Sequence, residues 1–235
     1  TLPLWNNYGG ILQAWALKNF LNSHNIETLV IDFHHNPPTK LESIKRKFKN
    51  FIKTKVFGKN NFSYPNLRQK EYISKSTLSF IRNEVSELSS KIYTIDELVR
   101  CTEHLDGVVV GSDQVWRPSY TPEIKRYFLD FVDSEKIKIS YAASFGTDDW
   151  LFSDIETNTC KELLQSFDLI TVRETSGIKL VKDKFNLSAK QVLDPTLLIP
   201  KYKYIELIER YDAPKSKGDL FAYILDRNDS TDSFL

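Results

Sequence analysis

Cysteine and histidine are scarce in this sequence, and methionine is missing altogether. The chain of 235 residues has two cysteines, Cys101 and Cys160, and four histidines. Two cysteines are too few for a disulfide-stabilised scaffold, and neither residue type has the spacing that metal ligands usually show. We therefore expect no metal site, and a chain that folds in a reducing compartment.

An excess of charge of one sign is also absent. Lysine and arginine total 32 and aspartate and glutamate total 31, so the formal net charge is +1. A surface built for nucleic acid is strongly basic, so we expect no nucleic-acid partner. No apolar run approaches the roughly 20 residues that a membrane-spanning helix needs. Hydrophobic residues at 41% and aromatic residues at 13% are nevertheless ample for a core, which indicates a soluble globular protein.

Short apolar runs alternate with helical patterns along most of the chain. The runs are rich in β-branched residues and contain few polar ones, which is typical of strands buried on both faces of a parallel sheet. They predict strands at residues 28–32, 107–110, 138–143, 168–172 and 189–193. Strands that alternate with helices form right-handed βαβ units. The predicted fold class is therefore α/β, with a doubly wound parallel sheet.

Several helices have a recognisable start. Thr94 with Glu97, and Ser153 with Glu156, fit the capping box, in which two side chains satisfy unpaired amides at a helix N-terminus. Residues 10–21 form a strongly apolar helical pattern after a glycine pair. The two capping boxes and the apolar pattern predict helices that begin near residues 10, 95 and 154.

Residues 40–59 are strongly basic, with eight lysines or arginines and one glutamate. Apolar residues recur there at helical spacing, which predicts a basic amphipathic helix within a helical insertion at about residues 40–100. Such a helix either presents a solvated lysine face or lies on an anionic membrane surface.

Polar loops follow the predicted strands, at the edge of the sheet where ligands bind in α/β folds. Asn7, Tyr8, Gly9 and Gly10 precede the first helix, where glycine lets a ligand approach and helix amides attract an anion. The alternative is a tight turn, because the spacing of nucleotide-binding loops is absent.

The loop after residues 107–110 contains Ser112, Asp113, Gln114 and Trp116. Asp113 is suited to accept a proton from a hydroxyl, Gln114 to orient that hydroxyl, and Trp116 to stack on a sugar ring. The alternative is a helix cap formed by Ser112 or Asp113, with Trp116 in the core.

Two further strand ends carry Ser144 and the segment Arg173, Glu174 and Ser176. The guanidinium of Arg173 is suited to hold a phosphate or a carboxylate. An ion pair with Glu174 is the alternative. For Asp194, a turn is the preferred interpretation.

Five segments together resemble the polysaccharide pyruvyl transferase family, in the order that the family has them: Asn7–Gly10, Val110–Trp116, Tyr141–Gly146, Arg173–Ser176 and Val192–Thr196. The resemblance implies a two-domain GT-B-like architecture, with the active site between two Rossmann-like halves. We expect residues 1–215 to be the N-terminal Rossmann-like domain and residues 216–235 to begin a second domain. Leu2-Pro3-Leu4 is similar to the end of a strand, so we expect this chain to be a piece of a longer protein.

The resemblance also implies a reaction, in which pyruvate moves from phosphoenolpyruvate onto two hydroxyls of one sugar residue as a cyclic ketal. No cofactor is expected. Asp113 and Gln114 are the candidate catalytic residues. The candidate substrate-binding residues are Asn7, Tyr8, Gly9, Gly10, Ser112, Trp116, Ser144, Arg173, Glu174 and Ser176. The resemblance places the general acid and much of the donor-binding machinery in the second half.

The implied acceptor is a glycan or lipid-linked glycan, a precursor of capsule or exopolysaccharide in the cytoplasm. Residues 40–59 would then contact the inner membrane surface peripherally. Two alternatives remain open, because one fold hosts many activities. One is a GT-B-like glycosyltransferase that uses a nucleotide sugar, and the other is a non-catalytic glycan-binding module.

Overall fold

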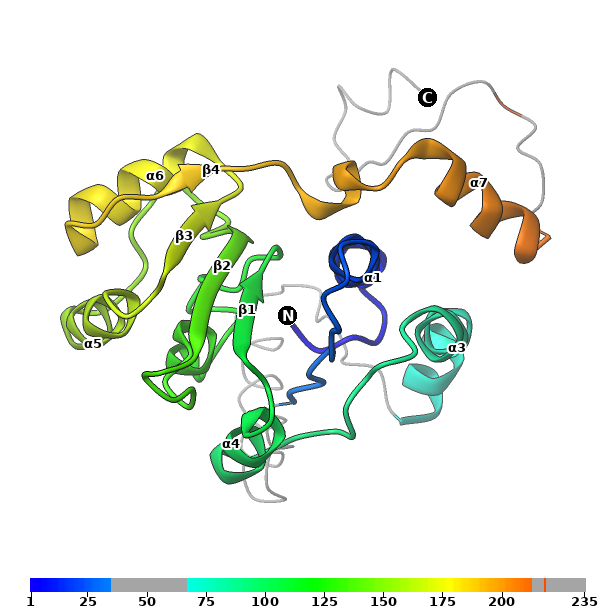
Figure 1. The fold of residues 1–235 in the computed structure, drawn as a ribbon, viewed down its shortest axis with the longest axis horizontal. Helices are drawn as coiled ribbons and strands as arrows, with labels where there is room; N and C mark the ends of the chain where they lie inside the picture. The colour runs from blue at the N-terminus through cyan, green and yellow to red at the C-terminus, as the bar shows by residue number, and fades with distance from the viewer. Residues whose placement is uncertain (35–66, 213–217, 219–235) are drawn as a thin grey trace, which may run out of the picture. The chain divides into compact units, whose positions relative to one another are not determined.

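The computed structural model describes residues 1–34, 67–212 and 218, and the chain divides into two compact units, Thr1–Ile199 and Pro200–Leu235. The first unit contains a parallel sheet with strands in sequential order (Figure 1). These strands are β1 (Gly107–Gly111), β2 (Ile137–Ala143), β3 (Leu169–Val172) and β4 (Lys190–Gln191). The predicted α/β class and four of the predicted strands are therefore confirmed.

Each connection between strands carries a helix. A 3₁₀ helix, Ile124–Phe128, follows β1, and α5 (Asp154–Leu164) follows β2. After β3 comes α6 (Thr175–Leu180), which continues as a π-helical turn. In Figure 1, α5 and α6 lie on the side of the sheet opposite α1 (Tyr8–Ser23). A doubly wound sheet has a point where the strand order reverses. The described sheet has no such point, so the doubly wound arrangement stays a prediction.

The prediction of a sheet strand at residues 28–32 is wrong, because this segment does not join the described sheet. It makes two isolated parallel bridges, Val30 with Leu88 and Phe33 with Ile92. Between them the amide of Asp32 donates to the Ser89 hydroxyl at 3.0 Å, in the place of a backbone carbonyl. This side chain interrupts the backbone ladder.

The predicted capping boxes are both confirmed. Thr94 and Glu97 satisfy each other's backbone amides at the start of α4 (Ile95–Thr102), and Ser153 and Glu156 do the same for α5. The other described helices are α3 (Leu67–Glu84), a 3₁₀ turn at Pro195–Leu198 and, in the second unit, α7 (Lys201–Arg210). Residues 40–59, which carry the predicted basic helix, and residues 219–235, most of the predicted start of a second domain, lie outside the described residues.

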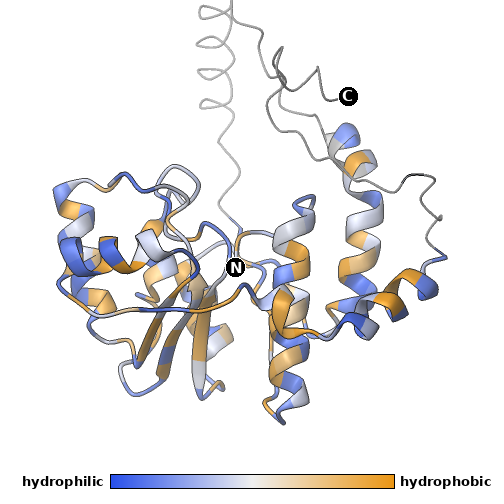
Figure 2. Ribbon diagram, turned by 90° about the horizontal axis from the view of Figure 1, so that it is seen from above, coloured by the Kyte–Doolittle hydropathy of each residue, from blue (hydrophilic) through white to orange (hydrophobic). Residues whose placement is uncertain are grey.

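Aromatic side chains fill the core between the sheet and the helices that follow β1, β2 and β3. Trp116 stacks on Phe128 with ring centroids 5.0 Å apart, and Phe152 and Phe185 contact Phe128 edge-on. Figure 2 shows hydrophobic residues along the strands and on the helices beside them. Among the described helices, none is both long and apolar enough to cross a membrane.

Candidate active site

The N-terminus of α1 meets the loop that follows β1. Asn7 is the N-cap of α1, and its Oδ1 accepts from the amide of Gly10 at 3.1 Å. Its Nδ2 donates to Oδ2 of Asp113 at 2.9 Å. Gly10 allows this approach, since a Cβ there would lie 3.0 Å from the same Asp113 oxygen. Tyr8 and Gly9 are exposed beside this contact.

Asp113 is held from two sides. Its Oδ1 accepts from the amide of Gln114 at 2.7 Å, while Oδ2 accepts from Asn7. The side chain of Gln114 turns away, because its Oε1 accepts from Arg117 at 2.7 Å and packs on Gly146. The backbone of Gln114, rather than the amide group of its side chain, therefore orients the carboxylate.

Trp116 does not fit the predicted role of stacking on a sugar, because its side chain has no exposed surface. The indole Nε1 donates to the carbonyl of Tyr127 at 2.9 Å, deep in the aromatic core. The backbone amide of Trp116 donates to the carbonyl of Ser144 at 3.1 Å, which draws the chain inward after β1. The alternative of a core tryptophan is the one the structure shows.

Arg173 connects three loops. Its Nε donates to Glu174 at 2.7 Å and its Nη1 to the carbonyl of Ser112 at 2.9 Å, while Asp194 lies 3.6 Å from Nη1. The Ser144 hydroxyl donates to the same Glu174 oxygen at 3.0 Å. The ion pair with Glu174, the alternative to an anion-binding role of Arg173, is therefore present.

Ser112 and Ser144 are buried and bond to the neighbouring loops. The Ser112 carbonyl accepts from Arg173, and the Ser144 hydroxyl accepts from the amide of Gly146 at 3.0 Å. Ser176 lies in the first turn of α6 and is half-buried.

Gln13 and Asp194 also belong to this cluster, although the sequence pointed to no role for Gln13 and only to a turn for Asp194. Gln13 of α1 donates through Nε2 to Asp194 Oδ2 at 2.5 Å, and Asp194 Oδ1 accepts from the amide and hydroxyl of Thr196. Asp194 was predicted as a turn residue, and it does begin the 3₁₀ turn as its N-cap. No local pattern signals its contact with Gln13, because 181 residues separate the two.

The carboxylates of Glu174 and Asp194 pair with the guanidinium of Arg173, and the Asp113 carboxylate lies on the neighbouring loop, next to Ser112, whose carbonyl Arg173 binds. Tyr141 on β2 is half-buried beside this cluster, and burial together with the charge of Asp194 raises the pKa of its phenol. Across the described ranges, no group of three or more metal-ligating side chains comes together. The side chains of this cluster can form hydrogen bonds with hydroxyl groups, and a carboxylate among them can accept a proton.

Comparison with known proteins places this chain in a family. The family model of polysaccharide pyruvyl transferase matches residues 7–234, nearly the whole chain. No curated protein and no solved structure matches the chain. The match begins at Asn7, the residue that caps α1 and holds Asp113. The chain therefore belongs to the polysaccharide pyruvyl transferase family, and the protein is a transferase.

Proposed function

We propose that this transferase moves pyruvate from phosphoenolpyruvate onto two hydroxyls of one sugar residue, and that the cluster around Asp113 binds the sugar. One hydroxyl oxygen bonds to C2 of phosphoenolpyruvate as C3 gains a proton from a general acid. The second hydroxyl oxygen then bonds to C2, the C2–O bond to phosphate breaks, and each hydroxyl loses its proton. The products are a cyclic ketal and inorganic phosphate.

The observation that carries this proposal is the position of Asp113. Its carboxylate is half-exposed at the carboxyl end of β1, and each of its oxygens accepts one hydrogen bond from the protein. A carboxylate oxygen has two acceptor sites, so each retains one for a sugar hydroxyl. Asn7 and the Gln114 amide fix the carboxylate in the orientation needed to receive the hydroxyl proton.

The charge of the cluster favours the sugar over phosphoenolpyruvate at this place. Three carboxylates repel an anionic donor, and the guanidinium of Arg173 already pairs with Glu174 and Asp194. Arg173 therefore positions the loops in this proposal, and Glu174 fixes Arg173 and Ser144. The anionic donor takes cations from another part of the enzyme.

The test incubates the protein with phosphoenolpyruvate and a panel of acceptor glycans, and follows phosphate release and the mass of the pyruvylated sugar. Asp113→Asn should lower the rate by about 10²–10⁴-fold, the usual contribution of a general base. Asp183→Asn, at an exposed position of the π-helical turn, is the matched control and should retain full activity.

Full activity of Asp113→Asn would show that Asp113 is not the general base. Binding of nucleotide sugars without any turnover of phosphoenolpyruvate would favour a glycosyltransferase instead.

A further inference from the structure

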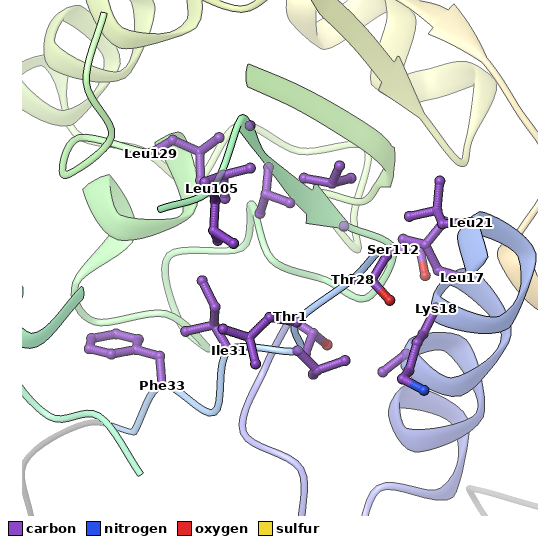
Figure 3. Close-up of a pocket in the computed structure, with 18 of the residues that line it drawn as sticks. Thr1, Leu17, Lys18, Leu21, Thr28, Ile31, Phe33, Leu105, Ser112 and Leu129 are labelled. Carbon is purple, nitrogen blue, oxygen red and sulfur yellow. The ribbon is translucent and has the colours of Figure 1, made fainter. Parts of the chain in front are cut away.

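The loop that contains Asp113 is held by an arginine on each side of that residue. On one side, Arg173 Nη1 donates to the carbonyl of Ser112 at 2.9 Å. Ser112 lies in the wall of the cavity that α1 and β1 line together (Figure 3). On the other side, Arg117 Nη1 donates to Oε1 of Gln114 at 2.7 Å. The two arginines therefore hold the residues immediately before and after the candidate general base.

Arg117 is itself fixed in place. Its backbone carbonyl accepts from the Thr121 hydroxyl at 2.7 Å, and its guanidinium lies over the ring of Tyr120, with Cζ 4.5 Å from the ring centroid. Within the described ranges, the guanidinium makes its one hydrogen bond to Gln114, and its Nε is buried without a partner. A side chain fixed by packing in this way holds its partner in a single orientation.

The amide group of Gln114 is enclosed from the other side by the loop after β2. Gly146 in that loop has a φ of +68°, which favours glycine, and a Cβ there would overlap Oε1 of Gln114. The amide of Gly146 donates to the Ser144 hydroxyl at 3.0 Å, which fixes the loop. The side chain of Gln114 is therefore confined between Arg117 and Gly146, and is not available to a bound sugar.

This confinement reaches Asp113 through the backbone. The amide of Gln114 donates to Oδ1 of Asp113 at 2.7 Å, so a rotation of Gln114 would move this donor away from the carboxylate. Catalytic groups need to be held within about 0.5 Å of their productive positions, and residues behind them supply that precision.

We propose that Arg117 is a positioning residue, which acts through Gln114 to keep the Asp113 carboxylate in the orientation that receives the sugar hydroxyl. The side chain of Gln114, predicted as catalytic, then contacts Arg117 and Gly146 rather than the substrate. This inference rests on the proposed function, in which Asp113 is the general base.

The first test compares Arg117→Met with the parent, because methionine keeps most of the length of the side chain and removes its donors. The variant should lower kcat about tenfold and leave KM for phosphoenolpyruvate and for the acceptor within about twofold, since a displaced base slows the chemical step without contacting either substrate. Arg100→Met, at an exposed arginine in the last turn of α4, is the matched control and should retain full activity. An unchanged kcat in Arg117→Met would overturn the inference.

Variants of Gln114 separate positioning from direct contact with the substrate. Gln114→Glu keeps an acceptor for Arg117 and should stay within about threefold of the parent, whereas Gln114→Leu should lose as much activity as Arg117→Met. The double variant of Arg117→Met and Gln114→Leu should be no slower than either single variant, because both remove the same contact. Losses that multiply, or an equal loss in Gln114→Glu and Gln114→Leu, would show that Gln114 acts on the substrate and would refute the positioning role.

Hydrogen exchange at the Gln114 amide distinguishes failure of this inference from failure of the proposed reaction. Arg117→Met should speed exchange there about tenfold, and Arg100→Met should leave it unchanged. A parent enzyme that does not turn over phosphoenolpyruvate would refute the proposed reaction, and the exchange rate would still report whether Arg117 fixes the loop. Equal exchange rates in Arg117→Met and the parent would refute the inference, whichever reaction the enzyme catalyses.

Discussion

At the scale of single residues, the site depends on Asn7, which performs two tasks with one amide group. Its oxygen caps α1 through the Gly10 amide, and its nitrogen donates to Asp113. A serine retains the capping oxygen and loses the donor to Asp113. The two tasks are therefore separable by substitution.

Asn7→Ser should leave the free energy of unfolding nearly unchanged and lower the transfer rate, because the Asp113 carboxylate loses one of its two fixed partners. Thermal unfolding and acceptor-dependent phosphate release measure the two effects. Ser153→Ala is the control at the cap of α5, and should cost about 1 kcal/mol of stability without loss of activity. Equal activity of Asn7→Ser and the parent would contradict the positioning role of Asn7.

The sequence predicts Asn7, Asp113 and Arg173 as site residues because each follows or precedes a recognisable element, and the structure brings Asn7 to Asp113 and Arg173 to the adjacent Ser112. It misjudged Trp116, since an aromatic residue in a loop has the same local pattern whether it faces a ligand or the core. Only the Tyr127 carbonyl and the Phe128 ring, brought by the connection after β1, decide between the two.

At the scale of elements, the first turn of α1 must approach the β1 loop closely. A Cβ at Gly10 would lie 3.0 Å from Asp113 Oδ2, whereas a Cβ at Gly9 would meet its nearest neighbour at 3.5 Å. The adjacent glycines of the sequence motif thus have different constraints, which the sequence alone does not reveal.

Gly10→Ala should lower activity by about tenfold, since the added methyl displaces the carboxylate by a few tenths of an ångström. Gly9→Ala should retain activity and gain some stability, because alanine favours a helix by about 1 kcal/mol over glycine. Parallel assays of both variants check this, and equal loss in both would refute the steric argument.

The attachment of α1 to the loop after α3 depends on pH. The buried Lys18 and the Ser86 hydroxyl both bind the Glu87 carboxylate, which lowers its pKa from 4.5 to about 2. Because the folded-state pKa is the lower one, this contribution is complete above pH 4.5 and disappears as the pH falls through about 2.

Glu87→Gln should therefore lower the melting temperature at neutral pH, and the difference from the parent should shrink as the solution is acidified towards pH 2. Melting curves recorded across this pH range provide the measurement. A difference that stays constant at all pH values would show that the Glu87 charge is not responsible.

The sequence patterns that predict helices and strands are local, so the predictions that depend only on neighbouring residues are the ones confirmed. The capping boxes at Thr94 and Ser153 lie within four residues, and both occur as predicted. The segment at residues 28–32 has the composition of a strand, yet Ser89, distant in sequence, binds one of its amides. Pairing with a remote partner is not encoded in the run itself.

At the scale of the whole molecule, the core around α5 is closed to solvent. Cys160 has no exposed surface, and burial raises the pKa of its thiol to about 12. Since the thiolate is the reactive form, Cys160 is inert in the folded protein. Cys101 is half-buried, with a pKa that burial raises as well.

Alkylation in native buffer should therefore modify Cys101 first and Cys160 only after unfolding. Mass spectrometry of each cysteine along a urea gradient checks the order, and Cys101→Ser removes the faster reaction as a control. Rapid modification of Cys160 without urea would show that the core opens locally.

The hydrogen bond from Gln13 to Asp194 joins the beginning of the first unit to its end. A ribosome that has made only the residues up to α6 has produced Asn7, Asp113 and Arg173, but not Asp194, the partner that binds Gln13 of α1. The cluster is therefore complete only when almost all of Thr1–Ile199 has been synthesised. Premature termination before Asp194 would yield a chain that carries the predicted catalytic aspartate in an unfinished site.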